Sequence, residues 1–112
     1  MKINTLTAAI LLTALAQPCT LIADEISFTR DIRPILSNKC YKCHGPDEDA
    51  RVTEMRLDTR HGLFGEKTAP HSPVVPRSLK RSEIISRILS EDPDIRMPPA
   101  ANNKDLTADE IT

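Results

Sequence analysis

Two cysteines and a histidine lie close together in the order Cys40, Cys43 and His44. In a C-x-x-C-H box of this kind, the two thiols add across the two vinyl groups of haem to form thioethers, and the histidine supplies an imidazole to the iron. The two intervening residues let both sulfur atoms reach one edge of the macrocycle, and the residue that follows brings its ring under the iron. The spacing therefore predicts covalent haem attachment at residues 40–44.

Other uses of a cysteine pair fit this sequence less well. A structural zinc site needs four ligands, but the remaining histidines, His61 and His71, lie ten residues apart in a loop-like stretch. A thioredoxin-like pair lies between a strand and a helix, whereas the segment before Cys40 has a helical pattern. A plain disulfide between Cys40 and Cys43 would leave His44 unexplained.

Residues 1–23 have the pattern of a secretory signal peptide, with a basic start, an apolar run over residues 6–15 and small residues after it. Ala16 fits the small-x-small rule best as a cleavage point. Cleavage after Ala23 also removes Cys19 and leaves only the two box cysteines, so we favour it. Polar residues interrupt the apolar stretch, which argues against an uncleaved anchor. We expect a periplasmic or secreted protein with no membrane span after signal removal.

Residues 24–112 are then one small domain. The chain has no tryptophan, one tyrosine and two phenylalanines, so a bound haem would supply the flat apolar mass that its own side chains lack. The formal net charge of the chain is −1, and the sequence offers no basic face for a nucleic acid.

A stripe of apolar residues at helical spacing over residues 28–36 predicts a helix that leads into the cysteine box. We expect Asp31 to be its N-cap. Pro34 then lies in the first turn, where its missing N–H would have had no intrahelical partner.

A second stripe predicts a helix over residues 79–90, with three charged side chains off its apolar face: Arg81, Glu83 and Arg87. Residues 45–78 hold all three glycines and four of the nine prolines, so we expect an irregular loop with a short helical turn near residues 57–62. Such a long loop is unusual in a small domain unless it wraps something, and haem is the expected object.

Thr107, Asp109 and Glu110 have the form of a capping box at the start of a helix. Only Ile111 and Thr112 follow, and helix nucleation alone consumes most of a turn. We therefore expect a domain whose C-terminal helix is missing or cut short.

An iron bound by His44 has a second axial position, for which the sequence offers Met55, Met97, His61 and His71. Two prolines follow Met97, so it is held extended in a stiff loop, and the 53 residues that separate it from His44 can reach the other haem face. We predict Met97 as the distal ligand and Met55 as a packing residue. Ligation by a second histidine and an open site are the alternatives.

Taken together, these motifs resemble the planctomycete-type cytochrome c domain, over nearly all of the chain beyond the signal. The resemblance is carried by six segments, which are FTRDIRPIL at 28–36, CYKCHGP at 40–46, RLDTR at 56–60, SEIISRI at 82–88, MPP at 97–99 and LTADEI at 106–111.

The resemblance implies a small, all-α, class I-like cytochrome c fold, whose helices are joined by long loops that wrap the cofactor. It implies one covalent haem c bound through Cys40, Cys43 and His44, and it also suggests Met97 as the distal ligand.

Two features depart from the family pattern. Residues 66–68 and 76–77 stand where the family usually has glycine-rich and Pro-Gly stretches, so this loop is expected to differ in shape. The family's last helix is the one that we expect to be missing or cut short. Because such domains usually stand at the front of larger secreted proteins, the expected partner is a redox protein or an attached larger domain.

An iron with all six positions filled has no place for a substrate, so the sequence predicts one-electron transfer rather than an enzyme. One alternative is a gas-binding or sensing module in which Met97 dissociates, and another is an interaction domain without haem. Arg56 is expected either to steady a haem propionate or to pair with Asp58.

Overall fold

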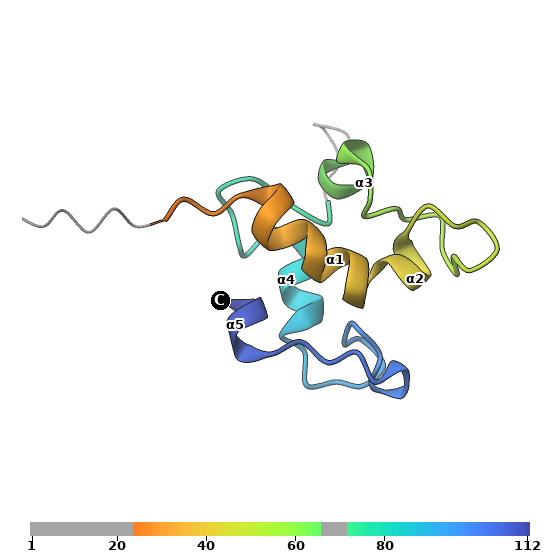
Figure 1. Cartoon of the computed structure of the whole chain (residues 1–112). Helices are drawn as coiled ribbons and strands as arrows, with labels where there is room; N and C mark the ends of the chain where they lie inside the picture. The colour runs from red at the N-terminus through yellow and green to blue at the C-terminus, as the bar shows by residue number, and fades with distance from the viewer. Residues whose placement is uncertain (1–23, 66–71) are drawn as a thin grey trace, which may run out of the picture.

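The computed structural model describes residues 24–65 and 72–112, and the expected signal peptide at residues 1–23 lies outside them. The described part of the chain is helical and has no β-strand element (Figure 1). This confirms the expected all-α secondary structure. Its elements are the π-helical turn η1 (Phe28–Ile32), α1 (Arg33–Lys39), α2 (Tyr41–His44), α3 (Arg60–Phe64), α4 (Glu83–Ile88), the 3-10 turn η2 (Ala100–Asn102) and α5 (Ala108–Ile111).

Within residues 24–65 and 72–112, no helix combines the length and the apolar character that crossing a membrane requires.

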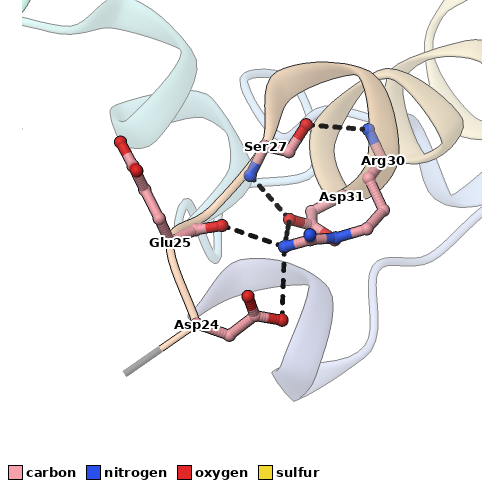
Figure 2. A network of polar contacts seen from close by, with 5 residues as sticks. All are labelled: Asp24, Glu25, Ser27, Arg30 and Asp31. Atoms are coloured by element: carbon pink, nitrogen blue, oxygen red, sulfur yellow. Dashed lines mark hydrogen bonds and ion pairs between the residues drawn. The ribbon is translucent and has the colours of Figure 1, made fainter. Parts of the chain in front are cut away.

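The first helical segment begins earlier than the sequence predicts, and the expectation that Asp31 is its N-cap is wrong. Ser27 is the N-cap, and its hydroxyl accepts a hydrogen bond from the backbone N–H of Arg30. Asp31 reaches back instead, accepting from the N–H of Ser27 at 2.7 Å and from the Arg30 guanidinium at 2.9 Å (Figure 2). The Arg30 hydrogen bond, followed by that from Ser27, holds the pKa of the Asp31 carboxyl below its ordinary value.

The helices meet at a small leucine core, against which half-buried Ile84 of α4 also packs. Its buried members are Leu36, Leu57 and Leu63. The predicted stripe over residues 28–36 reaches this core only at its C-terminal end, since Phe28 is 48% exposed and Ile32 is 36% exposed. The π-helical turn closes with an i to i+5 hydrogen bond, so the residues before Arg33 do not keep the 3.6-residue period of the stripe.

The loop after the cysteine box contains the predicted helical turn, displaced toward the C-terminus as α3. Thr59 caps this helix, because its hydroxyl accepts from the N–H of Gly62 at 3.0 Å. Gly62 also lies against the preceding chain, where a Cβ atom would meet the Arg56 carbonyl oxygen at 1.6 Å. A side chain at this position would therefore force α3 away from the loop.

The predicted helix over residues 79–90 is shorter than expected, because α4 covers only Glu83–Ile88. Buried Ser82 ends the preceding loop, where its hydroxyl accepts from the N–H of Val75 at 2.9 Å and donates to the carbonyl of Ser78 at 2.7 Å. Residues 79–81 are thus part of this hydrogen-bonded loop rather than of the helix.

The C-terminal segment runs below α1 and α4 in the view of Figure 1 and ends in α5. The predicted capping box is confirmed. The Thr107 hydroxyl accepts from the N–H of Glu110, whose carboxylate accepts from the N–H of Thr107 at 2.8 Å. A four-residue helix therefore begins where the sequence predicts it.

Candidate functional site

A cavity of about 290 Å³ opens between the cysteine box, the loop after it, α4 and the segment around Met97. Small-molecule sites have volumes of roughly 300 to 1,000 Å³, so the volume of this cavity is near the lower end of that range. Its lining is mostly apolar and consists of Lys39, Cys40, Cys43, His44, Val52, Met55, Leu57, Pro73, Glu83, Ile84, Arg87, Ile88, Met97, Pro98, Pro99 and Asn102. The structure thus brings all four predicted haem-binding residues to one cavity.

The cysteine box owes its geometry to α2. The backbone N–H groups of Cys43 and His44 both donate to the carbonyl of Cys40, at 3.1 and 2.9 Å. Positions i, i+3 and i+4 lie on one side of a helical turn, which is why both thiols and the imidazole face the same cavity. Both cysteines are free thiols and half-buried, so the donor set fits covalent haem.

Burial raises the pKa of the Cys40 thiol, and the neighbouring Cys43 adds to this shift. The thiol of Cys40 therefore stays protonated at neutral pH. An apolar, water-poor setting of this kind suits the apolar edge of a haem.

The imidazole of His44 is oriented by the main chain. Its Nδ1 atom lies 3.2 Å from the carbonyl oxygen of Met55. A carbonyl only accepts hydrogen bonds, so in the neutral ring Nδ1 carries the proton and Nε2 has the lone pair. His44 is thereby prepared to bind a metal ion through Nε2, with the other ring nitrogen satisfied by a backbone group.

Backbone hydrogen bonds also fix the loop that supplies this carbonyl. Val52 donates to the carbonyl of Cys43 at 3.2 Å, and Leu57 donates to the carbonyl of His44 at 2.7 Å. Gly45 allows the chain to turn directly after the box, because a Cβ atom there would lie 2.2 Å from the carbonyl oxygen of Tyr41. Neither this role of Gly45 nor that of the Met55 carbonyl was predicted from the sequence.

Met97 reaches the cavity from an irregular segment after α4. Its backbone N–H donates to the carbonyl of Arg87 at 3.1 Å. The side chain is half-buried, and Pro98, which follows it, is buried. Met97 therefore lines the same cavity as His44.

Charged residues also line the cavity, which the sequence analysis missed. Glu83 and Arg87 were expected off the apolar face of their helix, but both line the cavity, and their side chains form an ion pair at 2.9 Å. Glu83 and Arg87 are each followed directly by a lining isoleucine, so charged and apolar side chains four residues apart share one side of α4. The i, i+4 spacing of an acid and an arginine was the available signal.

The other candidate residues have different positions. Met55 lines the cavity, in keeping with its expected packing role. His61 is an exposed residue of α3 and is not part of the lining, whereas His71 lies outside the described residues. Arg56 pairs with Asp58, with a contact of 2.9 Å, and the hydrogen bond from Arg56 holds the pKa of the Asp58 carboxyl below its ordinary value.

Comparison with protein families matches residues 40–101 to the planctomycete cytochrome c family, and the chain belongs to this family. The matched segment begins at Cys40 and includes Met97. Cytochrome c domains bind haem c and transfer electrons, so membership indicates that class of function. Neither a curated protein nor a solved structure matches the chain.

Proposed function

We propose that this chain is an exported, class I-like c-type cytochrome domain that binds one haem and transfers single electrons. Cys40 and Cys43 would hold the haem through thioethers, and His44 and Met97 would be its axial ligands. The observation that carries the proposal is that one largely apolar cavity is lined by all four residues. When bound, haem supplies a one-electron iron couple.

The residues of the chain would do three things for this cofactor. The carbonyl of Met55 holds the His44 ring in the tautomer that leaves Nε2 available. The thioether of Met97 would favour ferrous iron more than a second imidazole does and so raise the reduction potential. Apolar side chains such as Ile84 and Ile88 line the cavity and limit its contact with water.

The proposal includes a division of the chain and a place of action. Residues 1–23 would direct export and be removed, and residues 24–112 would form the haem domain in the periplasm or outside the cell. With both axial positions of the iron filled, no position would be left for a substrate, and the domain would exchange electrons with a redox partner protein or with an attached larger domain. The proposal includes no nucleic-acid partner and no membrane span after removal of the signal.

The test of covalent attachment is expression with a cytochrome c maturation system, followed by denaturing acid-organic extraction. The wild-type protein should keep its haem. In Cys43→Ala a single thioether should hold the haem, and the double variant C40A/C43A should lose all of its haem. Quantitative loss of haem from the wild-type protein would contradict the proposal.

The test of distal ligation is Met97→Ala, with Met55→Ala as the matched control because Met55 lines the same cavity. Met97→Ala should abolish the ferric methionine-to-iron charge-transfer band and lower the reduction potential, whereas Met55→Ala should keep the band. An unchanged spectrum in Met97→Ala would point to a histidine ligand instead.

A further inference from the structure

The segment that carries Met97 is attached to α4 mainly through one residue. The carbonyl of Arg87 accepts the backbone N–H of Met97 at 3.1 Å. The guanidinium of the same residue donates from Nη1 to the carbonyl of Ile95 at 3.4 Å. Arg87 therefore contacts the main chain both at Met97 and two residues before it.

The side chain of Arg87 is in turn held by Glu83, one helical turn earlier. Its Nε atom donates to the Glu83 carboxylate at 2.9 Å, and both side chains are 39% exposed. A guanidinium is planar, so once its Nε–H is bound to the Glu83 carboxylate the directions of its other N–H groups are fixed. The carboxylate thereby aims Nη1 at the carbonyl of Ile95. Both residues line the cavity that Met97 enters.

We propose that Arg87 is a positioning residue for Met97 and that Glu83 orients Arg87 for this role. The inference rests on the proposed function, in which Met97 binds the iron. A thioether is a neutral ligand on a flexible side chain, and its apparent affinity increases with the fraction of time that its segment spends in the ligating conformation. Arg87 raises that fraction by fixing the chain on the N-terminal side of Met97.

The C-terminal side of the same segment has separate anchors on α1. Lys39 Nζ donates to the carbonyl of Asp105 at 2.7 Å, and Lys104 Nζ donates to Asn38 at 3.0 Å. Loss of the Arg87 side chain therefore removes the contact with Ile95, while the main-chain hydrogen bond from Met97 to Arg87 and the anchors on α1 remain. The expected effect is weaker ligation rather than loss of haem.

The experiment measures how readily exogenous imidazole displaces Met97 from ferric haem-loaded protein. Because an exposed ion pair is worth up to about 1 kcal/mol, Arg87→Ala should bind imidazole roughly three- to fivefold more tightly than wild type. Glu83→Gln should show a smaller increase in the same direction, and Arg87→Lys should lie between wild type and Arg87→Ala. The double variant E83Q/R87A should match R87A, because Glu83 acts through Arg87.

Arg81→Ala is the matched control, since Arg81 is an exposed cation just before the same helix and does not line the cavity. Its imidazole affinity should equal that of wild type, which separates positioning from a general loss of positive charge. Equal imidazole affinities in Arg87→Ala and Arg81→Ala would overturn the inference. If Arg87→Ala does not mature with haem, Glu83→Gln provides the test. An imidazole affinity of Glu83→Gln equal to that of wild type would then overturn the inference.

Failure of the proposed function has a different signature. If wild-type protein lacks the methionine-to-iron charge-transfer band, or if Met97→Ala keeps it, Met97 is not the ligand. If the band is present and depends on Met97 but the Arg87 and Glu83 variants do not change imidazole affinity, only the positioning role is wrong.

Discussion

The two sides of the cavity are held by different kinds of contact. The loop of residues 45–57, beside His44, is tied to the cysteine box by main-chain hydrogen bonds, among them Leu57 to His44 at 2.7 Å. The segment of residues 89–107, which carries Met97, is attached largely by charged side chains, among them Arg87 on α4 and Lys39 on α1.

This difference predicts different responses to solution conditions. Main-chain hydrogen bonds carry no net charge, so salt and moderate changes of pH leave them in place. Contacts of exposed charged side chains are weak and are screened by salt. We therefore expect a rigid histidine side and an adjustable methionine side, in which the ligand that sets the potential is also the easier one to displace.

The largest expected effect comes from damage to the histidine side at Gly45. In Gly45→Ala the new Cβ atom would meet the Tyr41 carbonyl oxygen at 2.2 Å, and the loop must move to relieve the contact. Overpacking of this kind costs about 1–3 kcal/mol. Denaturant unfolding of the haem-loaded protein should show this loss.

The matched control is Ala101→Ser, an exposed position on the methionine side, which should change the free energy of unfolding by less than about 0.5 kcal/mol. If Gly45→Ala is as stable as this control, the histidine side is not rigid and the comparison fails.

A smaller effect should follow from salt, and it should be confined to the methionine side. Raising the ionic strength from about 0.01 M to 1 M shortens the Debye length from about 30 Å to 3 Å. The affinity of ferric protein for imidazole should then rise about two- to fivefold, because screening weakens the Glu83–Arg87 pair and its neighbours. Titrations at fixed pH would measure this change.

Arg87→Ala should respond less to salt than wild type, since part of the screened interaction is already absent. A full wild-type response in that variant would mean that other charges govern the methionine side.

The smallest expected effect is a loss of stability at low pH, and it arises at the C-terminal end of the Met97 segment. The Glu110 carboxylate accepts one hydrogen bond from the backbone N–H of Thr107 and pairs with Lys39 at 3.5 Å. The backbone hydrogen bond from Thr107, with a contribution from Lys39, holds the pKa of the Glu110 carboxyl below its ordinary value of 4.5. This contribution to stability is complete above pH 4.5 and is lost as the pH falls through the lower pKa of the folded state.

Thermal unfolding from pH 6 to pH 3.5 should therefore show a smaller loss of Tm on acidification in Glu110→Gln than in wild type. Asp109→Asn serves as the control because Asp109 is exposed and adjacent. The same slope in wild type and Glu110→Gln would show that this carboxylate does not anchor α5.

Local patterns in the sequence predicted the parts of the site that depend on neighbouring residues. The spacing of Cys40, Cys43 and His44 predicted a box that α2 folds into one face, and Thr107 and Glu110 predicted a capping box that the structure contains. Such features follow from hydrogen bonds between residues three or four positions apart, which a sequence displays directly.

The predicted helix starts were wrong where two local hydrogen-bonding arrangements compete. Both Ser27 and Asp31 are suitable N-caps, and only the contact with Arg30 selects Ser27. The helix over residues 79–90 was predicted too long because the buried Ser82 hydroxyl takes part in the loop before it. Helix propensity does not choose between such local side-chain-to-backbone hydrogen bonds.

The sequence by itself supplied the donor set on which the proposed function rests, namely the cysteine box and a methionine before two prolines. Only the tertiary structure decided which distant groups support it. The Met55 carbonyl meets His44, and the Glu83–Arg87 pair turns toward the cavity, because loops of particular length return the chain to the box. Contacts between residues far apart in the chain depend on how all the intervening elements pack, and no local pattern encodes that.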